Sequence, residues 1–560
     1  AIELAAARVK LMSVEQTAAR LDDRFHLLGG GSRTAPPRHQ TLRAAMDWSY
    51  ELLSEQERAL LRRLAVFAGG WILEAAEAIY AEEGMDGEEY EVLDLLSQLV
   101  DKSLVMAEEQ DGEFRYRMLE TVRQYGLERL VESGEAEPVR GRHRDWCLRL
   151  AEQAEPELQG PKHKVWLGRL EREHDNLRAV LEWSLERGDA EVGLRLAGAL
   201  WWLWFVHGHW REGRQWLERA LSRSSAAGVA GTAARAKAIY AAAALAWRQW
   251  DHGRAAALAQ EGLTLCRDLG DRLGIAISLT ILGQVALRQG NLERAHAAFV
   301  ESQALYREIG HTWGIAATLL ALGFAADAQN DSTHAVVLYE ESARLFRELG
   351  EKWGLAMALR QLGQNAIFAG DYARATTLLE ESLMLCQELG DTAGIAYAQN
   401  PLGIAARSQG DYARAASLHQ ASLNLYRQLG DNGGIAYTLS HLGMLACRRG
   451  DNERAAELLR ESIAMFRQLG DKAALTTCLE GLAEVATAQG KHERAARLFG
   501  AAAVLREATG SPITASDRAG YKRAVASARA ALPDVVFAAA WAEGEAMSPE
   551  VAVEHALARF

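Results

Sequence analysis

One pattern is written six times between residues 271 and 510, with a fixed period of 40 residues. Gly270 precedes the first unit, and a glycine closes each of the six, at Gly310, Gly350, Gly390, Gly430, Gly470 and Gly510. A period in this range is the signature of a stacked repeat, in which each unit buries its apolar face against its neighbours. The repeat therefore restricts this part of the chain to a solenoid.

Each unit reads as two helices. A residue with a short side-chain oxygen precedes each half, such as Asp391 before the first helix and Asp411 before the second, and can accept from the unpaired N–H groups of the first turn. Gly or Asn ends each half and can adopt the left-handed conformation that closes a helix. These start and stop signals predict two antiparallel helices of roughly 17–19 residues in every unit.

The repeated columns carry a family resemblance. Leu282-Gly283, Ala295 and Phe299 resemble the tetratricopeptide pattern, here in a longer 40-residue form. The resemblance implies an all-α fold, a right-handed α-solenoid of tetratricopeptide-like helical hairpins. Ala255 falls in the alanine column, so we expect residues 231–270 to form a degenerate first repeat and the repeat domain to cover residues 231–510.

Residues 38–135 predict a small winged-helix domain. Helices are expected at about 41–53, 55–67, 73–81 and 88–100, and Ser54 with Glu57 forms a capping box for the second of them. Short strands are expected at 103–106 and 114–118, joined through Asp111-Gly112, a dipeptide typical of tight turns. A helix at 119–131 closes the domain.

A winged helix often reads DNA through the helix before its wing. Here that helix carries only carboxylates as charged groups, and they are Glu88, Glu89, Glu91, Asp94 and Asp101. Because carboxylates repel phosphates, we favour a scaffolding role over DNA binding. The chain's net charge of −13 also argues against DNA binding.

Three stretches resemble the bacterial STAND ATPases, switch proteins that regulate transcription and signalling and include relatives of the maltose-operon activator and of AfsR-type regulators. They are Ala1-Ile2-Glu3-Leu4-Ala5-Ala6-Ala7-Arg8, residues 39–50 (HQTLRAAMDWSY) and residues 64–70 (LAVFAGG). The resemblance implies that residues 1–37 are the end of the ATPase helical region with a linker. It also implies that the P-loop domain, and with it ATP or ADP, belongs upstream of Ala1.

The run from Tyr116 to Tyr125 falls where that class carries its Met-His-Asp motif, whose His senses the nucleotide phosphate. Leu119 stands at the His position and Glu120 at the Asp position. A leucine side chain cannot donate a hydrogen bond to a phosphate. Direct nucleotide sensing from this position is therefore not expected.

Residues 136–230 are expected to be a helical connector rich in tryptophan, and residues 511–560 a helical cap. Trp201, Trp202 and Trp204 cluster in the connector, either as a stacking platform for a ligand or, as we favour, as bulk that fills the junction. His174 is interpreted as part of a structural turn. In the cap, Ser516 and Ser548 are expected to begin helices, with Pro533 between them.

The varying columns of the repeats indicate where a partner binds. In a tetratricopeptide solenoid the first helix of each unit lines the concave face, and its variable positions are free for recognition. Arginine suits a carboxylate or phosphate, and tyrosine offers a flat amphipathic contact. The candidate groove consists of Arg360, Gln364, Tyr397, Asn400, Arg407, Tyr437 and Ser440. The alternative is that these side chains are merely solvated.

Catalytic and metal motifs are missing from the sequence, which has no GxxxxGK[ST], HExxH or GxSxG. We therefore expect no enzyme, cofactor or metal site in these residues. Five scattered cysteines and the absence of a long apolar run favour a cytoplasmic protein without membrane contact.

Two functional hypotheses remain. The first is the sensor arm of a STAND-type ATPase, in which the solenoid binds an inducer or a partner protein and the winged helix relays that event to the upstream nucleotide switch. The alternative is a constitutive scaffold for protein–protein interaction that clamps a partner and has no switch.

Overall fold

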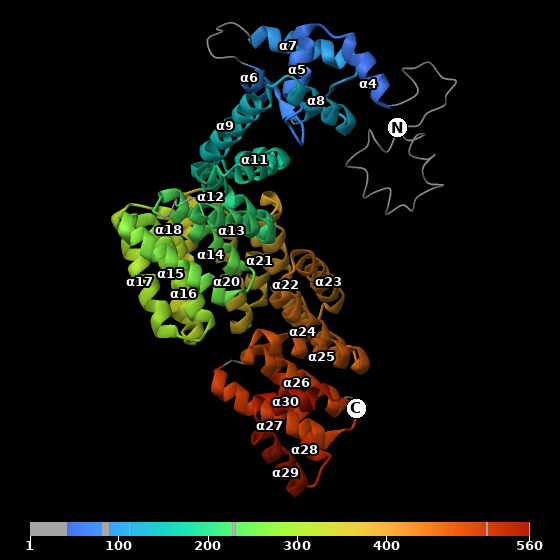
Figure 1. The fold of residues 1–560 in the computed structure, drawn as a ribbon. Helices are drawn as coiled ribbons and strands as arrows, with labels where there is room; N and C mark the ends of the chain where they lie inside the picture. The colour runs from blue at the N-terminus through green and yellow to red at the C-terminus, as the bar shows by residue number, and fades with distance from the viewer. Residues whose placement is uncertain are drawn as a thin grey trace, which may run out of the picture. The chain divides into compact units, whose positions relative to one another are not determined.

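The computed structural model describes residues 42–558 apart from 81–88, 111, 227, 229, 230, 511, 512 and 514 (Figure 1). The segment expected to be the ATPase remnant and linker, residues 1–37, lies outside the described residues. Residues 42–154 with 167–196 form one compact unit, and residues 155–166 with 197–558 form a second. The helices α10 (His163–Arg172) and α12 (Ala190–His207) contribute residues to both.

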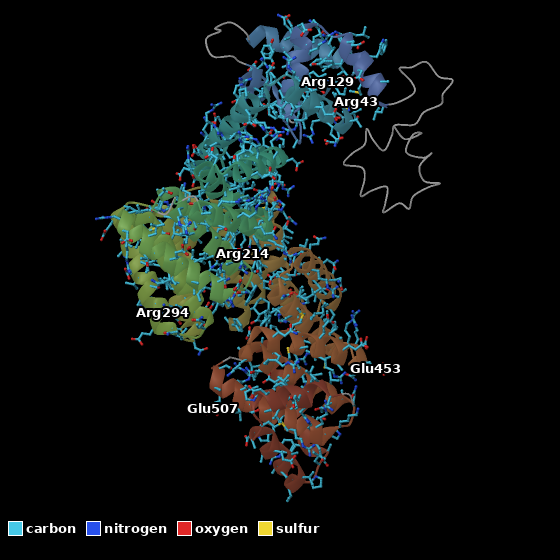
Figure 2. The ribbon with its side chains drawn as sticks, in the orientation of Figure 1. Arg43, Arg129, Arg214, Arg294, Glu453 and Glu507 are labelled. Carbon is cyan, nitrogen blue, oxygen red and sulfur yellow. The ribbon has the colours of Figure 1, made fainter. Side chains whose placement is uncertain are left out.

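The first unit begins with the winged helix that the sequence predicts. Its elements in chain order are α4 (Leu42–Glu51), α5 (Glu55–Leu64), β1 (Trp71–Ile72), α6 (Leu73–Tyr80), α7 (Glu89–Asp101), β2 (Met106–Gln110), β3 (Glu113–Arg117) and α8 (Glu120–Glu132). The predicted capping box is present, because the Ser54 hydroxyl accepts from the N–H of Glu57 and the Glu57 carboxylate accepts from the N–H of Ser54. Ion pairs of Arg43 with Glu128 and of Arg129 with Asp47 tie α4 to α8. Figure 2 labels the two arginines.

The wing differs from its prediction. Three antiparallel strands pair in the order β1-β3-β2, with Trp71 opposite Tyr116 and Met106 opposite Arg117. The strand expected at 103–106 instead begins at Met106, because Ser103 takes a left-handed φ of 58° at the end of α7. Leu104 and Val105 are buried in that turn and not in the sheet. The acidic residues of β2 do not resemble a strand in the sequence. β2 forms because it pairs with β3 across the turn at Gly112.

Two polar residues fasten α11 (His174–Arg187) to the winged helix. Asn176, fully buried, accepts from the N–H of Ala68 at 2.8 Å and donates to the carbonyl of Gly70 at 2.8 Å. The Glu173 carboxylate accepts from Arg115 of β3 at 2.5 Å. The stretch around His174 is thus a structural junction within this unit, together with α9 (Ala136–Ala154), which packs against α11.

The second unit contains the predicted repeats, each a helical hairpin. The hairpins are α14 and α15 (Ala233–Arg248, His252–Leu269), α16 and α17 (Arg272–Arg288, Leu292–Glu308), α18 and α19 (Thr312–Ala328, Ser332–Glu348), α20 and α21 (Lys352–Ala369, Tyr372–Leu389), α22 and α23 (Thr392–Ser408, Tyr412–Leu429), α24 and α25 (Asn432–Arg448, Asn452–Leu469), and α26 and α27 (Lys472–Ala488, His492–Thr509). The 40-residue period is thus one hairpin.

Two recurring contacts explain why the hairpin closes. Aspartates cap the helices as predicted; the Asp391 carboxylate, for example, accepts from the N–H of Gly394 at 2.8 Å. A buried serine on each central second helix ties it to the first helix, as where the Ser382 hydroxyl donates to the carbonyl of Ala356 at 2.7 Å. The same bond joins Ser422 to Ala396 and Ser462 to Ala436. Each of these contacts satisfies a buried polar group.

Three helices follow the last repeat: α28 (Ala515–Ala530), α29 (Asp534–Glu545) and α30 (Pro549–Leu557). Ser548 caps α30 as predicted, whereas Ser516 lies inside the first turn of α28. α29 crosses α27 so closely that a Cβ on Gly544 would lie 2.0 Å from the carbonyl oxygen of Arg497. Among the helices described, none combines the length and apolar character that a membrane span requires.

Candidate functional site

The seven predicted groove residues lie on three neighbouring first helices of the repeats. Arg360 and Gln364 come from α20, and the other five come from α22 and α24. These helices pack in succession, α20 against α22 and α22 against α24. The structure therefore places the predicted residues on three consecutive first helices, in the order that the repeat columns imply.

Tyr397 stands at the centre of a cationic and aromatic cluster. The guanidinium of Arg360 lies 5.1 Å from the Tyr397 ring centroid, and that of Arg248 lies 5.5 Å from it. Arg248 also lies over Trp210 at 4.4 Å and Phe205 at 4.9 Å. Such contacts hold a guanidinium over the negative faces of the rings. Burial lowers the pKa of Arg360 below its ordinary value.

Both groove tyrosines use their hydroxyls inside the solenoid. Tyr397 donates to the Asp431 carboxylate at 2.6 Å, and Tyr437 donates to Asp471 at 2.6 Å. Burial, reinforced by these carboxylates, raises the pKa of both phenols. A ligand on this face would thus meet the rings of the tyrosines and not their hydroxyls.

Three of the predicted residues are buried. Asn400, Arg407 and Ser440 are 9%, 6% and 3% exposed. Asn400 shares a hydrogen bond of 2.8 Å with the buried His419, and the Ser440 hydroxyl donates to the carbonyl of Tyr437 at 2.7 Å. Burial, then the neighbouring His441 and Arg407, hold the pKa of His419 well below its usual range. The part of the face open to a ligand is therefore carried by the half-buried Arg360, Gln364, Tyr397 and Tyr437.

An aromatic cluster beside this face was missed in the groove prediction. Trp202 of α12 stacks on Phe205 at 5.1 Å and meets Trp313 and Trp353 edge-on at 5.4 and 5.3 Å. Trp202 and Trp204 are 3% and 1% exposed, so they fill space against the repeats. Trp313 and Trp353 are 40 residues apart and occupy the same position of two successive repeats. This spacing could have indicated the cluster from the sequence alone.

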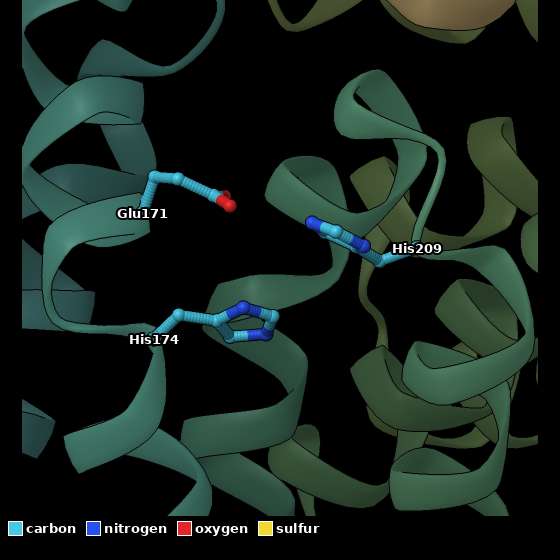
Figure 3. Close-up of side chains that lie close together, drawn as sticks. All are labelled: Glu171, His174 and His209. Carbon is cyan, nitrogen blue, oxygen red and sulfur yellow. The ribbon is translucent and has the colours of Figure 1, made fainter. Parts of the chain in front are cut away.

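The side chains of Glu171 and His174 are drawn in Figure 3, together with His209 of the second unit. Within the first unit, Glu171 of α10 and His174 of α11 offer two ligand atoms. A structural zinc site needs four protein ligands, and a catalytic one needs three. We therefore assign no metal to this pair.

Two family models match the chain. A winged helix-turn-helix domain matches residues 53–131, and a tetratricopeptide repeat matches residues 354–428, 394–468 and 434–508. The chain thus combines a winged helix with tetratricopeptide repeats, as the sequence predicts. Both are non-catalytic modules.

Curated relatives come from mycobacteria. A putative HTH-type transcriptional regulator of Mycobacterium tuberculosis is 45% identical over 288 residues, which cover 50% of this chain and 32% of the relative. An uncharacterized protein of the same species is 50% identical over 144 residues, covering 26% of this chain and 36% of the relative. The chain spans about a third of the length of the curated relatives it matches.

Solved structures resemble the chain at a lower level. A signal transduction ATPase with numerous domains (STAND) protein with a tetratricopeptide repeat sensor, from Pyrococcus horikoshii, shares 16% identity at a TM-score of 0.47, covering 90% of this chain and 71% of that one. A Rap protein complexed with competence and sporulation factor shares 12% identity at a TM-score of 0.43, covering 63% of this chain and 99% of that one.

Proposed function

We propose that this chain is the regulatory arm of a STAND-type transcriptional regulator. The repeats bind a peptide, a partner protein or a small inducer on the face formed by α20, α22 and α24. The winged helix passes that event to an upstream nucleotide switch in the cytoplasm. The kinship with a putative HTH-type transcriptional regulator supports a role in transcription.

The observation that carries the proposal is the cluster around Arg360 and Tyr397. Arg360 lies on the Tyr397 ring, and among the described residues its guanidinium has no carboxylate partner and donates instead to the sulfur of Met357 at 3.4 Å. The contact with the Tyr397 ring compensates only part of the cost of burying this guanidinium, and a negative group of a ligand would compensate the rest. A carboxylate or phosphate of the bound molecule would do so.

A ligand switches such an arm only if it binds one of two conformations of the regulator more tightly than the other. Equal affinity for both conformations would leave their populations unchanged. The winged helix is then the relay and not the DNA reader. Its helix α7 carries Glu89, Glu91, Asp94 and Asp101 and no lysine or arginine. DNA binding in the whole regulator would therefore require another module.

The test is a thermal-shift screen of the chain against anionic metabolites and lysate-derived peptides, followed by calorimetry on each hit. Arg360→Ala should abolish the shift, whereas Arg344→Ala, an exposed arginine of α19, should leave it unchanged. Asn400→Ala tests the buried part of the face and should weaken binding only through altered packing. Hits that survive Arg360→Ala would place the binding site elsewhere and contradict the proposal.

A further inference from the structure

A buried arginine without an ionic partner ends the first helix of the repeats. Arg248 is the last residue of α14 and is 7% exposed. Its Nε atom is enclosed and unbonded, and among the described residues its guanidinium makes no hydrogen bond or ion pair. It contacts instead the rings of Phe205, Trp210 and Tyr397. The rings compensate only part of the cost of burying this charge.

A second arginine contacts the same tyrosine ring. Arg360 lies 5.1 Å from the centroid of Tyr397, and Arg248 lies 5.5 Å from it. Burial is the main cause that lowers the pKa of Arg360, and the like charge of Arg248 adds to the effect. The two guanidiniums therefore repel each other. An anion that binds both of them would relieve the repulsion and the cost of their burial.

Two buried carboxylates adjoin this cluster, and both serve other groups. Asp431 accepts from the hydroxyl of Tyr397 and from the N–H of Gly434. Asp391 accepts from the N–H of Gly394 at 2.8 Å. Burial raises the pKa of Asp391, and the positive charges of the two arginines offset only part of that effect. Within the described part of the chain, neither carboxylate forms an ion pair with either arginine.

The two arginines come from repeats that are far apart in the chain. Arg248 belongs to the first hairpin, whereas Arg360 on α20 belongs to the fourth and Tyr397 on α22 to the fifth; Figure 1 labels α14, α20 and α22. An anion bound by both arginines would therefore link the first hairpin directly to the fourth. Such a link could act on the arrangement of the whole repeat domain.

A tryptophan two residues after Arg248 already makes a contact of this range. The ring of Trp250 lies against Gly433 at the start of α24, where a Cβ would lie 2.5 Å from the ring. Trp250 has a left-handed φ of 63°, at a position where every repeat between residues 271 and 510 has Gly or Asn. A bulky residue keeps this strained conformation only where its surroundings fix it. The contact between the first and sixth hairpins is therefore specific.

We propose that Arg248 and Arg360 together bind a small ligand with two negative charges, an organic phosphate or a dicarboxylate. The planar fork of arginine suits the oxygens of either group. The bound anion would favour the conformation in which Trp250 contacts Gly433, because only that conformation brings the two arginines to one ring. The inference rests on the proposed function and deepens it, since it names the class of ligand that the face around Arg360 binds.

The test is a thermal-shift titration of the whole chain with inorganic phosphate, succinate and acetate, at neutral pH and constant ionic strength. Phosphate or succinate should raise the thermal midpoint with a saturable dependence on concentration. Acetate carries one charge and should bind about tenfold or more weakly. The tighter of the two dianions distinguishes a phosphate ligand from a dicarboxylate. Absence of a saturable shift with either dianion, or acetate binding of equal strength, would overturn the inference.

Arg248→Met keeps an apolar side chain among the rings and removes the charge. It should weaken dianion binding about tenfold or more, while the midpoint without ligand should be at least that of wild type, because an unpaired buried cation is lost. Arg248→Lys keeps the charge without the fork and should retain part of the binding. The matched control is Arg288→Met, at the same position of the next repeat, where an exposed arginine lies 4.5 Å from the centroid of the Trp250 ring. It should leave dianion affinity unchanged.

The variants separate this inference from the proposed function. Binding that Arg360→Met abolishes and Arg248→Met leaves intact would overturn the inference and uphold the proposed face. Binding unchanged in both would contradict the inference and the proposed function together. If Arg248→Met melts lower than wild type and also fails to bind, partial binding by Arg248→Lys is required to uphold the inference. A lysine variant that folds and does not bind would then overturn it.

Discussion

The hydroxyl of Tyr397 donates a hydrogen bond of 2.6 Å to Asp431, the residue that caps α24. The second carboxylate oxygen of Asp431 accepts from the N–H of Gly434 at 2.9 Å. Asp431 is 2% exposed, so its charge is compensated by these donors. Asp431 therefore caps its own helix and also accepts a hydrogen bond from the preceding repeat. Tyr437 and Asp471 form the same contact one repeat further on.

Tyr397→Phe should therefore loosen the contact between repeats. The change keeps the ring and removes one donor from a buried carboxylate, which costs about 1–3 kcal/mol. Urea unfolding followed by circular dichroism should show a lower midpoint than wild type. Tyr412→Phe, at a position that is 37% exposed, is the matched control and should leave the midpoint unchanged. Equal midpoints for all three proteins would show that the Asp431 carboxylate finds another donor.

The sequence predicted the repeat helices well because their signals are local. Gly390 ends α21, and the adjacent Asp391 caps α22. Each residue acts on its own helix end and needs no distant contact. The same is true of Ser54 with Glu57. By contrast, β1 has two residues, Trp71 and Ile72, and exists only because β3 pairs with it. α29 was missed for a similar reason, since its place is set by the close crossing of Gly544 over α27.

The candidate face could be predicted as a set of positions but not as a set of accessible atoms. A column assigns Asn400 to the first helix correctly, but the column does not show that Asn400 bonds the buried His419. His419 stands where the other repeats between residues 271 and 510 have Leu, Phe or Tyr. The role of Arg248 was not visible either. Its contact with Tyr397 joins residues 149 positions apart, and no local pattern in the sequence reports it.

Gly390→Val should destabilise the repeats through the backbone alone. Gly390 has a left-handed φ of 68°, and a Cβ there would meet nothing within 4 Å. The expected cost is about 1–3 kcal/mol, because a β-branched residue resists this conformation. Gly390→Asn is the control, since Asn330 adopts a φ of 62° at the end of α18 in another repeat. Thermal melting should rank wild type, the Asn variant and the Val variant in that order of decreasing stability. A Val variant as stable as wild type would contradict the assigned helix end.

The winged helix should not bind duplex DNA in this chain. Its helix α7 offers carboxylates and no basic side chain, so it would repel the phosphate backbone. Fluorescence anisotropy with a labelled random-sequence duplex at low salt should show no saturable binding. Asp94→Lys with Asp101→Lys should create weak, salt-sensitive binding if charge is the reason for the absence. Binding by the wild type that weakens as salt rises would disprove the scaffolding role.

Glu351 gives the repeats a pH dependence near neutrality. It caps α20 at a position where α16, α22, α24 and α26 have Asp, and it is 2% exposed. Burial raises the pKa of Glu351 from its ordinary value of 4.5 to about 7, against the hydrogen bonds from the N–H groups of Gly354 and Trp353. The folded chain thus keeps a proton that the unfolded chain has already released. The resulting stability is fully present below pH 4.5 and is lost as the pH rises through about 7.

Glu351→Gln should remove this dependence. The amide cannot ionise, so the variant should match wild type at acidic pH and become relatively more stable as the pH rises, by on the order of 3 kcal/mol at pH 8. Thermal melting of both proteins in steps between pH 5 and pH 8 measures the difference. Glu453→Gln, which removes an exposed carboxylate from α25, controls for the change in net charge and should run parallel to wild type. A constant difference between Glu351→Gln and wild type at every pH would mean that Glu351 stays ionised in the folded chain. The two backbone N–H groups would then outweigh its burial.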